Sequence, residues 1–295
     1  MPSSPICVCD ACPTHGPVLE RIAKGYASSS ITDPQWEVIE PLLPPPGNTG
    51  GKGGRNEKWP RRTVLDAIFY VSRGGITWAA LPAGFPPAGT VYWWFAAWTR
   101  QGVWERIHDA LRDQLRVRLD RDPEPSAAII DAQTVRASRL VREGSSGYDA
   151  GKKVKGRKRH LAVDTNGLLL ALVVTAASIQ DRDGAIRVMA ALGARFSHIA
   201  HVWVDGGYAG RFVTLAKQVW GVVIDVVKRS DDAKGFQLLH RRWVVERTFG
   251  WLMMHRRLVR DYETRAKHHE AFVHIALIMT MSRRLAIPAT TNKTS

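Results

Sequence analysis

Apolar residues in the first part of the chain recur at the spacing of helices. A capping box at Thr32–Gln35 opens a first amphipathic stretch, which three consecutive prolines end. Further apolar stripes of helical period predict helices over 61–73, from 90 to 102, and over 103–119. Residues 31–119 are therefore predicted to form a small all-helical domain.

The pattern changes after residues 120–126, a polar linker that contains two prolines. Runs of β-forming residues and helical stripes then alternate along the chain. We predict strands over 127–135, 159–163, 168–175, 199–204 and 222–227, and helices over 183–192, 211–219 and 237–257. Three strands followed by alternating helices and strands are typical of an RNase H-like α/β domain.

This order predicts a mixed five-stranded sheet with flanking helices over residues 127–265. Residues 266–295 are predicted to form a C-terminal helix followed by a disordered tail. The hairpin signal Asp164-Thr165-Asn166-Gly167 joins the second and third strands. The fold class expected for the whole chain is thus an RNase H-like α/β core preceded by a helical domain.

Composition changes the picture mainly through charge. The 295 residues are 45% hydrophobic and include 11 Trp, which is enough for a sizeable core. They carry 42 Lys and Arg against 27 Asp and Glu, a net charge of +15, which favours nucleic acid or an anionic membrane as partner. The sequence has no membrane-length apolar run and no signal-peptide pattern, so we expect a cytoplasmic protein of the bacterial nucleoid.

With this charge, the short helices and glycine-bearing turns of residues 31–119 fit a helix-turn-helix-like DNA-binding module. Its candidate phosphate contacts are Arg61, Arg62, Arg73 and Arg100. The aromatic residues at 93–98 have the spacing either of a base-stacking patch or of a helical core, and the core is favoured.

A basic run follows the first predicted strand. It contains Arg136, Arg139, Arg142, Lys152, Lys153, Lys155, Arg157, Lys158 and Arg159. Such a run is either a solvated face or a track for the DNA backbone, and its place beside Asp131 favours the track. His160 is a candidate for orienting a phosphate or a metal-bound water, although a structural role is favoured for a lone histidine beside a basic strand.

The three cysteines lie together near the N-terminus. Cys7, Cys9, Cys12 and His15 supply enough ligands for a tetrahedral zinc ion, but their spacing is irregular. The favoured interpretation is that residues 1–30 are a disordered or non-native extension from an upstream start codon. Because all three cysteines lie within this short segment, no disulfide is expected to staple the core, and we expect a reducing compartment.

Three acidic residues carry the candidate chemistry. Asp131 lies in the first predicted strand, Asp205 follows the fourth, and Glu246 lies on the last long helix. The two strands are expected to be neighbours, so that their carboxylates converge at one edge of the sheet beside Glu246. Three oxygen ligands of this kind suit Mg²⁺ or Mn²⁺, and two such ions are typical of phosphodiester chemistry.

Each acid also has a structural alternative. Asp131 and Asp205 are candidates to accept backbone N–H groups in turns, and Glu246 to pair with Arg242 one helical turn away. Glu246 lies among apolar residues, where an unpaired carboxylate is costly, and this favours metal binding. Asp181 and Asp183 are interpreted as caps of the following helix.

Several motifs together resemble the DDE transposases of bacterial insertion sequences, specifically the insertion-sequence-five family. They are IIDAQTVRAS, GYDAGKKVKGRKRHLAVDTNG, VDGGYAG and RRWVVERTFGWLMMHRRLVRDYE, with ITDPQWEVIEPLLPPP and LPAGFPPAGTVYWWF nearer the N-terminus. The resemblance covers residues 31–265. It implies an RNase H-like core, Mg²⁺-dependent cleavage at terminal inverted repeats, and strand transfer into target DNA.

The resemblance assigns the three acidic positions to Asp131, Asp205 and Glu246, and the arginine of the family's Y-x2-R-x3-E-x6-K signature to Arg242. Leu239 stands at the tyrosine position and Met253 at the lysine position, so the accessory phosphate contact departs from the pattern. Arg256 or Arg257 is expected to take the role of that lysine.

Two other functions remain open at this stage. One is a non-catalytic DNA-binding regulator derived from a transposase, and the other is an RNase H-like nuclease that acts on hybrids or junctions. The presence of all three acids disfavours the regulator, and the helical N-terminal domain disfavours the nuclease. A transposase must hold two DNA ends together, so we expect a homodimer on double-stranded DNA.

Overall fold

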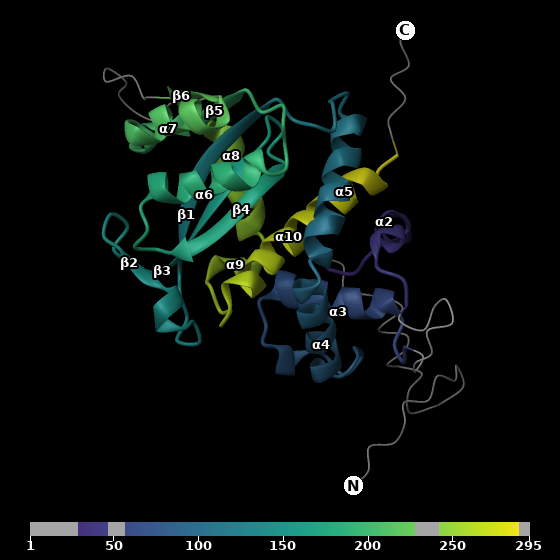
Figure 1. The fold of residues 1–295 in the computed structure, drawn as a ribbon. Coiled ribbons are helices and arrows are strands. Elements are labelled where there is room, and N and C mark those ends of the chain that lie inside the picture. Colours follow the sequence, from purple (N-terminus) through teal and green to yellow (C-terminus); the bar gives the residue numbers. More distant parts are fainter. Residues whose placement is uncertain (1–28, 47–56, 228–241, 289–295) are drawn as a thin grey trace, which may run out of the picture.

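A twisted mixed sheet forms the centre of one half of the molecule, and helices from both ends of the chain pack together in the other half (Figure 1). The structure is a computed structural model, which describes residues 29–46, 57–227 and 242–288. The four N-terminal ligand candidates, Leu239 and the C-terminal tail lie outside these residues.

The sheet contains six strands among the described residues. They are β1 (Ala127–Arg136), β2 (Gly147–Asp149), β3 (Val154–Val163), β4 (Leu169–Ala176), β5 (His201–Asp205) and β6 (Val223–Val227). The order is β2-β3-β1-β5-β6, and β4 also pairs with β3. Strand β3 runs antiparallel to β1, β2 and β4, whereas β1, β5 and β6 are parallel to one another. This confirms the α/β fold class with its antiparallel and parallel portions.

The predicted sheet was one strand too small. Strand β2 was missed because it is three residues long and includes a glycine, so that it shows no apolar alternation. Strand β3 begins at Val154 and not at residue 159, since its first half consists mostly of basic residues. Its pairing with β1 and β4 therefore determines the strand more than its own composition does.

Two helices cover one face of the sheet. They are α6 (Asp181–Gly193) and α7 (Arg211–Trp220), and their apolar residues pack on Ile130, Leu170, Val202 and Val204. Alternation along β1 and β3 sends Ile129 of β1 and Leu161 of β3 to the other face, where they join a larger core. That face is covered by α8 (Arg242–Met253), α9 (Arg256–Val259) and α10 (Ala266–Ala286).

The N-terminal helices pack around α10. They are α2 (Asp33–Ile39), α3 (Arg61–Gly74), α4 (Ala88–Arg100) and α5 (Val103–Arg118), as the periodicity predicted. Phe95 and Trp98 are buried, which confirms a core role for most of the aromatic run, whereas Trp93 is exposed. In the described part of the chain, no helix is both long and apolar enough to cross a membrane.

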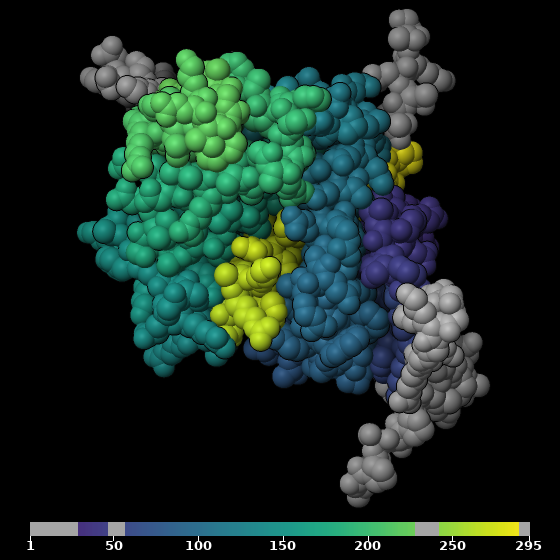
Figure 2. Space-filling model, in the orientation of Figure 1, coloured from purple at the N-terminus to yellow at the C-terminus, as the bar shows by residue number. Residues whose placement is uncertain are grey.

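Helix α10 joins the two halves of the molecule. Phe272 stacks on Phe95 of α4 with ring centroids 4.8 Å apart, and Ser282 accepts a hydrogen bond from Gln35 of α2 at 3.1 Å. One continuous core therefore contains residues of α3, α5, α8, α10 and the sheet. Figure 2 shows the yellow C-terminal segment in the seam between the blue helices and the green α/β part. The predicted domain boundary at 120–126 stays a prediction.

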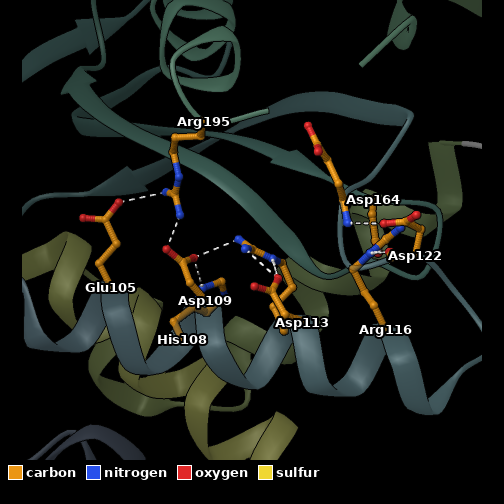
Figure 3. A network of polar contacts seen from close by, with 10 residues as sticks. Glu105, His108, Asp109, Asp113, Arg116, Asp122, Asp164 and Arg195 are labelled. Carbon is orange, nitrogen blue, oxygen red and sulfur yellow. Dashed lines mark hydrogen bonds and ion pairs between the residues drawn. The ribbon is translucent and has the colours of Figure 1, made fainter. Parts of the chain in front are cut away.

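A polar network on α5 fastens this helix to the sheet (Figure 3). Arg116 forms a buried ion pair with Asp164 in the turn between β3 and β4, and its Nε donates to the Asp122 carbonyl at 2.7 Å. Near the other end of α5, Arg195 pairs with Glu105 at 2.8 Å and with Asp109. The helical half is thus fixed to the α/β half at both ends of one helix, to the β3–β4 turn at one end and to the turn after α6 at the other.

Candidate active site

The first and fourth predicted strands are neighbours, as expected. Strand β1 pairs in parallel with β5 through Ala127–Ile129, so Asp131 and Asp205 lie toward the same carboxyl edge. Each carboxylate uses one oxygen to accept a backbone N–H. Asp131 Oδ1 accepts from Ala132 at 2.7 Å, and Asp205 Oδ1 accepts from Gly207 at 2.8 Å. These contacts hold the side chains in place and leave the second oxygen of each for another partner.

Register places Asp131 on the same face of the sheet as α8. Asp131 lies opposite Leu161 in the β1–β3 ladder, and Leu161 packs in the core beside α8. A cavity of about 640 Å³ opens at this point. Its lining includes Asp131, Glu246 and Lys152. The helix carboxylate and the first strand carboxylate therefore border one hollow.

Arg242 lies close to both Asp205 and Glu246. Its Nη2 lies 3.8 Å from Oδ2 of Asp205 and 3.5 Å from Oε1 of Glu246. The expected structural alternative for Glu246, an ion pair with Arg242, is thus present. The expected burial of Glu246 was wrong, because its side chain is 49% exposed at the start of α8.

The charges at this edge affect one another. The pKa of Asp131 is raised to about 6, mainly by burial and also by the neighbouring charge of Asp205, while the Ala132 N–H and Arg242 oppose the shift. Burial also raises the pKa of Tyr208, and Asp131, Asp181 and Asp205 add to that effect. The Tyr208 hydroxyl is buried and has no hydrogen-bond partner among the described residues. The unpartnered Tyr208 hydroxyl and an excess of negative charge therefore lie at the same edge of the sheet.

This donor set fits a hard divalent cation. Carboxylate oxygens are the preferred ligands of Mg²⁺ and Mn²⁺, and burial together with the neighbouring charge of Asp205 disfavours the ionised form of Asp131 unless a cation lies beside it. Arg242 supplies one positive charge between two of the acids. As the side chains stand, no three His, Cys, Asp or Glu among the described residues are spaced to hold one ion.

Comparison with known proteins agrees with the fold and with the predicted family. A family model described as "Transposase DDE domain" matches residues 122–281, which is more than half of the chain. The chain belongs to the DDE transposase family. A second model, "Putative transposase of IS4/5 family", matches residues 31–108, the predicted N-terminal domain.

Two relatives of this transposase-family chain come from Burkholderia cepacia. An "Insertion element IS402 uncharacterized 16.2 kDa protein" is 34% identical over 38% of this chain and 76% of its own length. A "Putative transposase for insertion sequence element IS402" is 32% identical over 41% of this chain and 60% of its own length. The matched part of the chain thus spans less than two thirds of the second relative.

The predicted DNA track of the transposase needs correction. Arg157, Lys158 and Arg159 are buried, because the pleat of β3 turns them toward the packed faces of the sheet. Arg157 pairs with Asp261 at 3.0 Å, Lys158 with Asp181 at 2.9 Å, and Arg159 bonds to Gln133 at 2.9 Å. These three side chains are internal contacts and leave the set of DNA-binding candidates.

Three further arginines that were predicted to contact DNA form ion pairs within the protein. Arg257 is buried and pairs with Glu263 at 2.7 Å, so it does not take the role of the missing lysine. Arg61 pairs with Glu57 at 2.6 Å, and Arg62 pairs with Asp33 at 2.6 Å. Arg73 and Arg242 are partly exposed, and the predicted contacts that remain exposed are Arg100, Arg136, Arg139, Arg142, Lys152, Lys153, Lys155 and Arg256.

Two residues behind the sheet differ from expectation. Asp181 and Asp183 lie in the first turn of α6, but Gln180 is the N-cap and no side-chain cap bond forms. Asp181 instead pairs with Lys158.

His160 is buried against Gly184 and contacts Thr175 through Nε2 at 2.9 Å, which agrees with its structural interpretation.

Sequence reasoning missed Tyr208. It follows Asp205 in the segment VDGGYAG, and its ring packs on Phe212 with centroids 6.2 Å apart. The segment itself was noted, but a tyrosine in a glycine-rich turn gives no sign that its hydroxyl lies near the acids. The topology of β5 and its following turn provides that information.

Proposed function

We propose that this chain is an active insertion-sequence transposase. It binds the terminal inverted repeats of its element on double-stranded DNA and catalyses Mg²⁺-dependent strand cleavage and strand transfer. The observation that supports this most is the placement of Asp131, Asp205 and Glu246 around one edge of the sheet, with Arg242 between two of them. Membership of the family supports the reaction class.

In this proposal, Asp131, Asp205 and Glu246 hold two Mg²⁺ or Mn²⁺ ions. When bound, the ions activate an attacking water or 3′-hydroxyl and stabilise the leaving oxygen. The backbone N–H groups of Ala132 and Gly207 fix the orientation of the two aspartates. Binding requires deprotonated carboxylates, so the raised pKa of Asp131 makes ion binding release a proton at acidic pH.

DNA contacts come from the exposed cations around the cavity. Lys152 lines the same hollow as Asp131 and Glu246, and Lys153 and Lys155 follow it in the sequence. Arg242 and Arg256 border α8 from its two ends. A phosphodiester in the cavity would meet lysine on one side and the acids on the other, which suits the binding of a backbone phosphate.

The test uses duplexes taken from the DNA on either side of the gene. We expect the wild-type protein to nick them in Mg²⁺, and Asp131→Asn, Asp205→Asn and Glu246→Gln each to reduce nicking roughly a hundredfold or more. Duplex binding without metal should stay within about twofold. Asp183→Asn, on the opposite face of the sheet, is the matched control and should nick normally.

Normal nicking by one of the three variants would remove that residue from the site. Wild-type protein that binds these duplexes but never nicks them would instead support a regulator derived from a transposase. Cleavage of RNA–DNA hybrids in preference to duplex ends would support a general nuclease.

We also propose that the protein acts in the bacterial nucleoid as a dimer on DNA, because two element ends must be held together. Sizing the protein with and without the end duplex tests this. A complex with one protein chain per duplex and no higher species would contradict it.

A further inference from the structure

A second hollow lies beyond the end of β1. Its volume is about 300 Å³, and three cations from separate segments line it. Arg139 comes from the loop after β1, Lys155 from β3, and Arg260 from the residues after α9. Ser138 and Ser146 add hydroxyl groups, and Glu143 is the acid in the lining. The hollow therefore has an excess of positive charge and several hydrogen-bond donors.

Glu143 does little to neutralise the positive charge of this hollow. Lys155 Nζ lies 3.2 Å from Glu143 Oε1, but the two side chains are 62% and 91% exposed. An ion pair so exposed contributes little free energy, so an incoming anion can replace Glu143 at small cost. Arg260 donates to the Ala137 carbonyl at 3.1 Å, which uses one of its N–H groups. Its other donors have no hydrogen-bond partner among the described residues and are available to a ligand.

Buried Arg157 holds the walls of the hollow in place. It donates to the Ser145 carbonyl at 3.1 Å on one side and to the Glu263 and Thr264 carbonyls at 2.8 and 3.1 Å on the other. Asp261 extends the sheet, because its carbonyl accepts from Ser138 N–H at 2.7 Å. The loop that carries Glu143 and the segment that carries Arg260 are thus tied to β3. A site fixed in this way loses little entropy when it binds.

The hollow and the candidate active site lie on the same face of the sheet. Asp131 pairs with Leu161 and Val135 with Arg157, so alternate residues of β1 from 131 to 135 face the side of α8 and α9. The active-site cavity is lined by α8, and Arg260 follows α9 directly. Ala137 lies six residues beyond Asp131, and Ser138 lies seven residues beyond it. At the rise of an extended strand, these separations correspond to about 20 to 23 Å.

We propose that the Arg139, Lys155 and Arg260 hollow binds a phosphate of the DNA backbone. For a duplex that runs along β1, this site lies about six to seven base pairs from the bond that is cut, since each base pair advances about 3.4 Å. The ligand class follows from three cations that project from backbone segments tied to one another. Binding of DNA at this hollow stands without the proposed function, whereas the stated distance rests on it.

The first test measures binding of a mixed-sequence duplex of about 30 base pairs in the absence of divalent metal. One variant carries Arg139→Gln, Lys155→Gln and Arg260→Gln. Its matched control carries Arg182→Gln, Arg187→Gln and Lys217→Gln, which removes the same charge from exposed positions of α6 and α7 on the opposite face. We expect the first variant to bind about tenfold more weakly than the control, with a salt dependence reduced by about one phosphate.

Equal binding by the two triple variants would overturn the proposal and leave the hollow to an anion other than DNA. Because Arg260 contacts Ala137, we add the single variant Arg139→Glu, whose original guanidinium has no hydrogen bond or ion pair with a described residue. It should fold with an unchanged melting temperature and still lose duplex affinity. Wild-type affinity in this variant would also overturn the proposal.

The second test locates the phosphate on a duplex that the protein nicks. Single phosphates are replaced by neutral methylphosphonates, and binding is measured for the wild-type protein and for the Arg139, Lys155 and Arg260 variant. Replacement about six to seven base pairs from the nick should weaken only the wild type, as in a double-mutant cycle. Coupling at another distance would overturn the stated position. Failure to nick any duplex would contradict the proposed function and leave the first test intact.

Discussion

Arg242 Nη2 lies 3.5 Å from Oε1 of Glu246, one turn further along α8. The same guanidinium lies 3.8 Å from Asp205. Arg242 is therefore an internal counter-ion at the place where the acids are proposed to hold a divalent cation. This relationship makes the arginine a competitor of the metal as well as a neighbour of the DNA.

We expect Arg242→Gln to bind Mn²⁺ roughly three- to tenfold more tightly than the wild type, because a repelling positive charge is removed. Arg242→Lys should bind Mn²⁺ as the wild type does. Titration of free Mn²⁺ by electron paramagnetic resonance measures this without any DNA or turnover. Unchanged or weaker Mn²⁺ binding in the glutamine variant would rule out competition between the arginine and the metal.

Arg157 is expected to act on stability and not directly on DNA. Arg157→Ala leaves Asp261 in the interior with a weaker set of partners, so we expect the free energy of unfolding to fall by about 3 to 5 kcal/mol. Arg139→Ala, at an exposed position, should change it by less than about 0.5 kcal/mol. Urea denaturation measures both. If the Arg157→Ala protein has normal stability but fails to bind DNA, Arg157 is a DNA contact after all.

The two arginines that fasten α5 to the α/β half should differ in importance. Arg116 pairs with Asp164 out of contact with water, so Arg116→Ala is expected to cost about 3 to 5 kcal/mol of stability. Arg195 is 26% exposed, and Arg195→Ala should cost about 1 kcal/mol or less. Chemical denaturation followed by tryptophan fluorescence tests the ranking. Equal losses would show that burial does not determine the strength of this interface.

Asp66 of α3 gives a prediction for pH. Burial raises its pKa to about 6, although it accepts a hydrogen bond from Ile31 N–H at 2.7 Å. The folded protein therefore binds this proton more tightly than the unfolded chain, and the contribution of Asp66 to stability is lost as pH rises from about 4 to 6. Asp66→Asn keeps an acceptor for Ile31 and should stabilise the protein by about 1 to 3 kcal/mol at pH 7.

At pH 4 the same substitution should have almost no effect, because the aspartic acid is then largely protonated in the folded state. Thermal or urea unfolding at the two pH values measures the difference, with exposed Asp183→Asn as the control. An equal gain at pH 4 and pH 7 would contradict a raised pKa for Asp66.

The sequence predicted most of the regular structure because apolar periodicity is a local property. Helices α3 and α5 were located within one or two residues, since each has a continuous apolar stripe. The first half of β3 was missed because basic residues occupy it, and their pairing with β1 depends on residues far away in the chain.

The candidate site was predicted only in part for the same reason. Strand order alone predicted that Asp131 and Asp205 lie near one another, and the β1–β5 pairing confirms that the two strands are neighbours. A count of charges did not distinguish Lys155, which is exposed, from Arg157, which is buried two residues later. That difference depends on Asp261 and the carbonyls after it, which a basic run does not reveal.

The place of α10 in the core has a consequence for biosynthesis. This helix packs on α2, α4 and α5, yet it leaves the ribosome after every other described element. Until residues 266–286 emerge, the apolar sides of the N-terminal helices lack their main partner. These helices cannot complete their core before then, because a domain generally folds as a unit. We therefore expect nascent chains that stop before α10 to be poorly folded and quickly degraded, so that transposase made from an interrupted gene copy does not accumulate to occupy element ends.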